Sequence, residues 1–311
     1  MALASCGGSD STNSSPTIVA KASSSGDAQT AVVASTLPLP IRVLVTNGGA
    51  AQANITVNWA TTGTGASMNP ASSTTDVNGI ATTVWILSQA AGAQSATAAV
   101  SGATGSPITF TATGTPDAPT AFTGLGGDAQ SKAANAVFDE PLLVKISDQF
   151  GNPIAGQTVT WAVTSGSASV LPASGPTNAA GTASATLTAG ATLGAVTVVA
   201  TPPGGLAPIT FNESVIPPPV VVNVGALGTI SYTSAHNGTV NPAIDSVAVG
   251  GQVQWVWASG THRVESTGIP AFTSGPTQSS GSYTVTFNTA GTYQYDCGIH
   301  GNLMTGTIVA H

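Results

Sequence analysis

VTWAVTSGSASVLPAS, residues 159–174, repeats with small changes a segment that first occurs as VNWATTGTGASMNPAS, residues 57–72. Trp59 and Trp161 occupy the same place in the two copies. The copies begin about one hundred residues apart, which is the size of a whole domain and too long for one unit of a solenoid. The repeat therefore predicts two successive domains of one fold.

Short runs of alternating apolar and polar residues, rich in Val and Thr, occur throughout both copies. Gly, Pro, Asn and Ser separate these runs, as turn residues separate strands. Evenly spaced short strands over about 100 residues favour an immunoglobulin-like β-sandwich. The strands we expect are 41–46, 55–61, 80–87 and 108–113 in the first copy, and 142–148, 158–164, 182–188 and 195–201 in the second.

Two segments of the second copy carry a resemblance to a known family. SDQFGNPIAGQTVTW (147–161) and PTNAAGTASATLT (176–188) resemble the bacterial immunoglobulin-like repeats of the invasin and intimin type. The first copy is more degenerate, because TNGGAAQANITVNW (46–59) lacks the Gly-Asn-Pro turn. The resemblance extends over residues 32–217, and it implies spacers that project a terminal domain.

The repeats lack the residues of a catalytic site. Neither copy contains a histidine or a cysteine, and no G-x-S-x-G motif is present. GLGGDA (124–129) has no strand–helix context that would make it a dinucleotide-binding loop. The sequence does not predict an enzyme.

Charged residues are scarce. They make up 5% of the chain, against about 25% in ordinary domains. The five basic residues are scattered and the net charge is −7, so nucleic acid is not an expected partner. No apolar run approaches the roughly 20 residues that a membrane helix needs.

The N-terminal segment LASCGGSDS (3–11) resembles a bacterial lipoprotein cleavage box. That resemblance implies a lipidated Cys6, membrane association through the lipid, and an exported protein of the bacterial cell envelope, either periplasmic or at the cell surface. Only five residues precede Cys6, whereas a signal peptide contains an apolar stretch of about 7–15 residues. The alternative is a disordered tail with a free thiol.

A proline-rich segment marks the last boundary. VIPPPVV (215–221) contains three consecutive prolines, which favour a stiff, extended linker. All four histidines and one of the two cysteines follow it. The organisation we expect is a lipobox-like start and flexible tether at 1–31, immunoglobulin-like domains at 32–116 and 117–217, and a third domain at 218–311.

The third domain also has strand patterns. Alternation predicts that each of two strands has one buried face. The residues of these faces are Val253, Trp255 and Trp257 on the first strand, and Tyr293, Tyr295 and Cys297 on the second. Cys297 would then lie at the rim of a β-sandwich core.

YDCGIHGNLM (295–304) gathers Cys297, His300 and Met304 on one short loop. Thiolate and thioether favour Cu(I), imidazole suits copper in either state, and two His, one Cys and a weak axial Met form the blue-copper arrangement. A second histidine must come from elsewhere, and His262, on a loop between strands, is the best candidate. His236 in a polar turn and the terminal His311 are weaker candidates.

Two segments resemble the plastocyanin-like cupredoxins. They are GGQVQWVWASGTHRV (250–264) and GTYQYDCGIHGNLMTGTIVA (291–310). The resemblance implies an all-β chain in which two immunoglobulin-like β-sandwiches precede a cupredoxin Greek-key β-sandwich. It also implies one type 1 copper with the metal ligands His262, Cys297, His300 and Met304. Two other interpretations remain open: a cysteine that is only a small buried apolar residue, and a structural zinc site, which normally has four N/S ligands.

These patterns predict a non-enzymatic, copper-binding electron-transfer protein. Its copper would cycle between Cu(I) and Cu(II), and the immunoglobulin-like domains would hold it away from a lipid anchor. The cupredoxin resemblance implies that an unidentified redox protein would dock on an apolar patch around His300, flanked by Ile299, Gly301 and Leu303. The alternative is a structural or adhesive surface protein with a copper-binding cap domain. Copper storage is less favoured, because the chain has three methionines in total.

Overall fold

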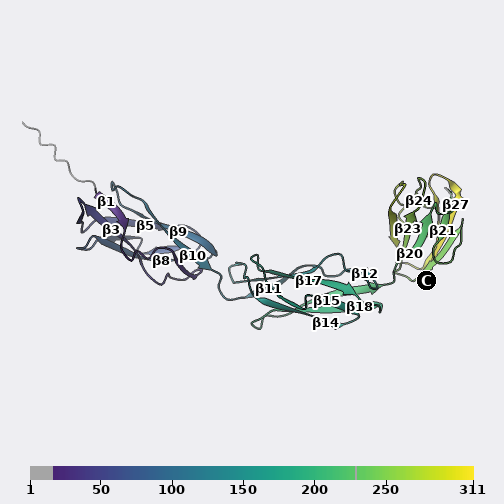
Figure 1. Cartoon of the computed structure of the whole chain (residues 1–311), viewed down its shortest axis with the longest axis horizontal. Helices are drawn as coiled ribbons and strands as arrows, with labels where there is room; N and C mark the ends of the chain where they lie inside the picture. The colour runs from purple at the N-terminus through teal and green to yellow at the C-terminus, as the bar shows by residue number, and fades with distance from the viewer. Residues whose placement is uncertain (1–16, 228–229) are drawn as a thin grey trace, which may run out of the picture. The chain divides into compact units, whose positions relative to one another are not determined.

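The computed structural model describes residues 17–227 and 230–311 (Figure 1). Within these ranges the secondary structure consists of strands β1 to β27, with no helix. Consequently no helix in the described part of the chain is long and apolar enough to cross a membrane. The predicted all-β class is confirmed, and each β-sandwich is described below by itself.

The first sandwich consists of two sheets. One has the strand order β1 (Thr17–Lys21), β3 (Ile41–Asn47), β8 (Ile80–Ile86) and β6 (Ser67–Asn69), with β4 (Ala50–Ala51) paired to β3. The other has the order β2 (Gln29–Val32), β10 (Ile108–Thr115), β9 (Gly92–Ala99), β5 (Thr56–Thr61) and β7 (Ser72–Thr74).

The second sandwich repeats this strand order. One sheet has the order β11 (Ala121–Gly126), β13 (Leu142–Ser147), β17 (Thr182–Ala189) and β15 (Ala168–Leu171). The other has the order β12 (Ser131–Ala133), β19 (Ile209–Ile216), β18 (Gly194–Thr201), β14 (Thr158–Ser165) and β16 (Ser174–Pro176). Each position in one order has its counterpart in the other, apart from the short β4. The predicted repeat of a whole domain is therefore confirmed, and so are the eight predicted strands.

The repeated tryptophans lie in equivalent core positions. Trp59 packs on Phe110 with ring centroids 6.2 Å apart, and Trp161 packs on Phe211 at 5.9 Å. All four side chains are buried. An aromatic side chain of this size contributes a large part of the apolar area that a small sandwich can bury.

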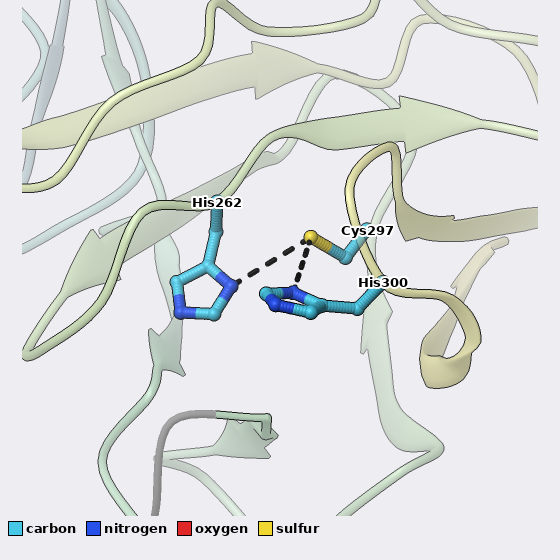
Figure 2. A group of neighbouring side chains, drawn as sticks. All are labelled: His262, Cys297 and His300. Carbon is cyan, nitrogen blue, oxygen red and sulfur yellow. Dashed lines mark hydrogen bonds between the residues drawn. The ribbon is translucent and has the colours of Figure 1, made fainter.

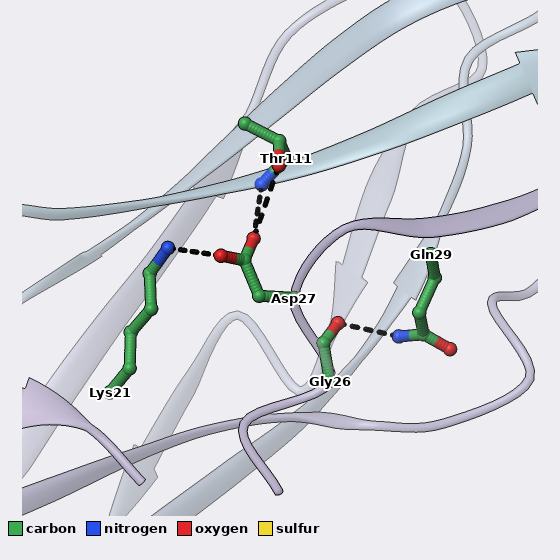
Figure 3. A network of polar contacts seen from close by, with 5 residues as sticks. All are labelled: Lys21, Gly26, Asp27, Gln29 and Thr111. Atoms are coloured by element: carbon green, nitrogen blue, oxygen red, sulfur yellow. Dashed lines mark hydrogen bonds and ion pairs between the residues drawn. The ribbon is translucent and has the colours of Figure 1, made fainter.

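The predicted tether is too long. Residues 17–31 include β1 and all but the last residue of β2, and Val19 is buried in the core of the first sandwich. Figure 3 shows the polar contacts of this segment: Lys21 contacts Asp27, and the Asp27 carboxylate accepts hydrogen bonds from Thr111 N (2.8 Å) and Thr111 Oγ1 (3.2 Å) on β10. The polar composition suggested a tether, but these polar side chains form hydrogen bonds that attach the segment to β10 of the sandwich. Cys6 and the lipobox-like segment lie outside the described residues.

The third sandwich pairs β21 (Tyr232–Ser234), β20 (Val220–Val224), β23 (Gln252–Trp257) and β25 (Ser282–Thr286) in one sheet. The other sheet contains β22 (Ala243–Val247), β27 (Gly301–Ala310), β26 (Gly291–Cys297) and β24 (Val264–Ser266). β20 runs parallel to β23 and β22 runs parallel to β27. The two predicted apolar faces are buried, which confirms both alternation patterns.

Candidate metal centre

Cys297 ends β26 with its side chain fully buried, and it is not part of a disulfide. The β26–β27 pairing shifts register at this point, so that Cys297 pairs with Gly301. Irregular pairing of this kind re-aims a side chain at the end of a strand. A backbone hydrogen bond from His300 N to Cys297 O (3.0 Å) closes the turn and brings the His300 side chain back toward the sulfur.

His262 reaches the same place from the loop between β23 and β24. Its backbone exchanges two hydrogen bonds with Gln278, both 2.9 Å long, and its side chain is fully buried. Two residues later, Val264 pairs with Cys297 in the β24–β26 ladder. This pairing explains how residues 35 positions apart become neighbours.

The three side chains converge on one point (Figure 2). Cys297 Sγ lies 3.6 Å from His262 Nδ1 and 3.3 Å from His300 Nδ1. The potential ligand atoms of all three lie within 4.8 Å of one another. Within residues 17–227 and 230–311, this is the one group of three or more His, Cys, Asp or Glu side chains with such spacing.

The hydrogen bond of His262 Nε2 fixes its tautomer. Nε2 lies 3.1 Å from Ser259 O. A carbonyl oxygen can only accept, so Nε2 carries the proton and the Nδ1 lone pair faces the sulfur. Burial lowers the pKa of His262, the nearby His300 lowers it further, and the bond to Ser259 opposes the change. The net lowering of the pKa favours the neutral imidazole, which is the form that binds a metal.

Met304 lies on β27 and is fully buried, in the same core cluster as Cys297. Its assignment as a metal ligand stays a prediction. His236 and His311, the weaker candidates, are exposed and do not belong to the converging group. Of the predicted ligands, the structure thus brings His262, Cys297 and His300 together, and buries Met304 in the adjoining core.

The donor set fits a soft or borderline metal ion. It offers one sulfur and two imidazole nitrogens whose lone pairs can point at a common centre, and this combination suits copper. A structural zinc site would normally have a fourth N/S ligand, and no fourth His or Cys joins this group among the described residues. The binding of copper stays a prediction.

Sequence reasoning missed the groups that form hydrogen bonds around the ligands. Ser259 binds His262 through its backbone carbonyl, and Tyr232 and Asn241 bind backbone carbonyls next to predicted ligands. Contacts to backbone atoms leave no residue-type signature, because any amino acid supplies a carbonyl. The fold must be known before they can be found.

Known proteins resemble different parts of the chain. A family model described as bacterial Ig-like domain (group 1) matches residues 123–212. FdeC, an Escherichia coli adhesin, is 16% identical over 98% of this chain and 99% of its own, with a TM-score of 0.43. The D00–D0 domain of intimin is 18% identical over 64% of this chain and 99% of its own, with a TM-score of 0.33. A purple cupredoxin from Nitrosopumilus maritimus is 17% identical over 30% of this chain and 97% of its own, with a TM-score of 0.22.

No curated protein matches the chain. The family match covers most of the second sandwich, and the first sandwich has the same strand order. The prediction of immunoglobulin-like domains is therefore confirmed. The three solved structures are less than 25% identical to this chain and their TM-scores lie below 0.5, so the assignment of the fold does not rest on them.

Proposed function

We propose that this chain is a bacterial cell-envelope protein in which immunoglobulin-like sandwiches, with a structural or adhesive role, carry a copper-binding domain. The bacterial immunoglobulin-like match at residues 123–212 supports the first half of this proposal. Neither immunoglobulin-like sandwich contains a histidine or a cysteine, so the chemistry is assigned to the third sandwich.

The convergence of Cys297 Sγ with the Nδ1 atoms of His262 and His300 carries the copper proposal. These three residues, with Met304, would hold one ion of the type 1 class, and the cupredoxin resemblance implies the same set. Bound copper would supply one-electron exchange between Cu(I) and Cu(II). The chain's own contribution is a donor set that strand pairing, burial and the Ser259 carbonyl hold in place.

Electron transfer is the finer function we propose for this domain. His262 and Cys297 are fully buried, whereas His300 is only partly buried. His300 is thus the one member of the group that reaches the surface. Exposed Ile299 and Leu303 lie on either side of it in the sequence. A redox partner would approach His300 over these apolar side chains.

The test is a visible absorption spectrum of the whole chain after Cu(II) is added. We expect an intense thiolate-to-Cu(II) charge-transfer band that reduction abolishes and reoxidation restores. Cys297→Ser should remove the band completely, while Cys6→Ser should leave it unchanged. A colourless wild type would exclude a type 1 site. A band that cannot be reduced and restored would favour the alternative, in which copper only stabilises a cap domain.

A further inference from the structure

Tyr232 contacts the backbone beside two predicted ligands. Its side chain is fully buried on β21, and its Oη lies 3.1 Å from the carbonyl oxygen of Arg263 and 3.3 Å from that of Asp296. Arg263 directly follows His262, and Asp296 directly precedes Cys297. Because a carbonyl only accepts, the Tyr232 hydroxyl is the donor. One hydroxyl proton therefore lies between the segments that carry these two ligands.

Asn241 extends the same arrangement to the segment that carries Met304. Its Oδ1 accepts from Tyr232 N at 2.9 Å, and its Nδ2 donates to Ile230 O at 2.8 Å and to Leu303 O at 3.2 Å. This pattern fixes the orientation of the amide, because the N–H needs an acceptor and the two carbonyls need donors. Leu303 directly precedes Met304.

The surroundings leave Tyr232 little freedom. Its ring packs edge-on against Tyr295 with centroids 5.0 Å apart. Arg263 O also accepts from Gly298 N at 3.0 Å, so the residue after His262 is bonded to the residue after Cys297. Burial raises the pKa of Tyr232, with smaller contributions from nearby acidic groups, so the hydroxyl keeps its proton.

We infer that Tyr232 and Asn241 are positioning residues that set the spacing of the segments bearing His262, Cys297 and Met304. Each of these three has a chain neighbour whose carbonyl accepts a hydrogen bond from one of the two side chains. His300 is placed differently, by its own backbone bond to Cys297. This inference rests on the proposed metal site. It states that hydrogen bonds from Tyr232 and Asn241 hold the predicted metal ligands in place before any metal binds.

The first experiment uses metal-free protein and measures how fast a thiol reagent modifies Cys297. The whole chain carries Cys6→Ala, which leaves Cys297 as its one thiol. Tyr232→Phe removes only the hydroxyl. We expect Cys297 to react roughly fivefold faster, because the loss of one hydrogen bond allows this region to open more often. Tyr293→Phe is the matched control, because that buried hydroxyl donates to Thr289 O (2.9 Å), and it should change the rate less than twofold.

The second experiment uses Cu(II)-loaded protein. Tyr232→Phe should shift the charge-transfer band and weaken copper binding roughly 10–100-fold, as expected when a group that orients metal ligands is lost. Asn241→Asp keeps the acceptor for Tyr232 N but turns a carboxylate oxygen toward two carbonyls. It should therefore also shift the band, while Tyr293→Phe should not.

An unchanged thiol rate together with an unchanged band in Tyr232→Phe would overturn the inference. If Tyr232→Phe does not fold, NMR of the wild type decides. The hydroxyl proton of the fully buried Tyr232, which two carbonyls can accept, should exchange slowly enough to give its own signal, and the absence of that signal would count against the inference. A different result would refute the proposed function. A wild type that stays colourless with Cu(II) would refute copper binding, while the metal-free thiol rates would still test the role of Tyr232.

Discussion

The immunoglobulin-like sandwiches and the C-terminal sandwich are both built from two sheets, but their cores hold different chemistry. Each immunoglobulin-like core is centred on a Trp–Phe pair in the same position. The C-terminal core also buries a histidine, a cysteine and a methionine, and it contains tyrosine hydroxyls that bind backbone carbonyls. The two-sheet architecture is therefore common to all the sandwiches. The C-terminal one differs in the residues at its strand ends and in the hydrogen bonds that orient them.

Removal of a core tryptophan tests whether the sandwiches are independent, and it has the largest expected effect. Trp161→Ala should destabilise the second sandwich by about 3–5 kcal/mol, because it leaves a cavity against Phe211. Differential scanning calorimetry of the whole chain should show one transition displaced, while the Cu(II) band stays unchanged. Leu171→Ala, at a side chain that is 75% exposed, is the control and should change stability by less than about 0.5 kcal/mol. Loss of the copper band in Trp161→Ala would show that the sandwiches depend on one another.

One of the buried positions at which the two immunoglobulin-like sandwiches differ has an ionisable side chain in the second sandwich only. Ala112 on β10 corresponds to Glu213 on β19, and both are buried. Burial raises the pKa of Glu213 to about 7, the nearby Asp128 adds to the rise, and the hydrogen bond from Gln130 N opposes it. Between the ordinary pKa of 4.5 and about 7 the folded state therefore binds more protons than the unfolded state, so stability falls as pH rises through this range.

Glu213→Gln should remove this pH dependence. Above pH 7 it should stabilise the second sandwich by roughly 1–3 kcal/mol, because no buried charge has to form. The measurement is urea unfolding at several pH values between 4.5 and 8, followed by a signal from the second sandwich. Exposed Glu140→Gln in the same sandwich is the control. Equal pH profiles for the wild type and Glu213→Gln would contradict the prediction.

Met304→Leu tests whether Met304 of the C-terminal core is a metal ligand or only a packing residue. Its side chain is fully buried, as that of an apolar packing residue would be. The swap nearly conserves volume, so it should cost less than about 1.5 kcal/mol. If the thioether is the axial ligand, the variant should still bind copper but its reduction potential should change. Met68→Leu, at a half-buried methionine of the first sandwich, is the control. An unchanged potential would assign Met304 to packing alone.

Whether the sequence could predict a feature depended on whether a pattern in the sequence itself marks that feature or whether it arises only when distant segments pair. Strand alternation is local, and it correctly predicted the buried faces that contain Trp255 and Cys297. The repeat of Trp59 as Trp161 predicted the duplicated domain. The N-terminal strands were missed because β1 and β2 have only five and four residues, and their partners lie far along the chain on β3 and β10. The contacts of Tyr232 and Asn241 were missed because they depend on pairing between distant segments.

The smallest expected effect concerns the exposed apolar surface beside His300, which has no counterpart in the immunoglobulin-like sandwiches because they contain no histidine. Leu303 is 67% exposed next to Met304, and its backbone carbonyl, not its side chain, accepts the bond from Asn241. Leu303→Asp should therefore leave the copper band intact. It should slow electron exchange with a redox partner by roughly two- to tenfold, because a charge placed on an apolar docking surface must be desolvated.

The charges of the domain predict how this rate responds to salt. The domain has four charged residues: Asp245 is buried, Asp296 is half-buried, and Arg263 lies 3.7 Å from Glu265, so that these two largely cancel. Steering would need a field that persists beyond the Debye length of about 8 Å at physiological salt, and this surface has too few charges to supply one. Stopped-flow reduction of the Cu(II) form should thus depend weakly on ionic strength in the wild type. Ile269→Asp, at a side chain 98% exposed on another loop, is the matched control and should react like the wild type. A steep salt dependence, or equal rates for Leu303→Asp and Ile269→Asp, would refute docking through the apolar surface beside His300.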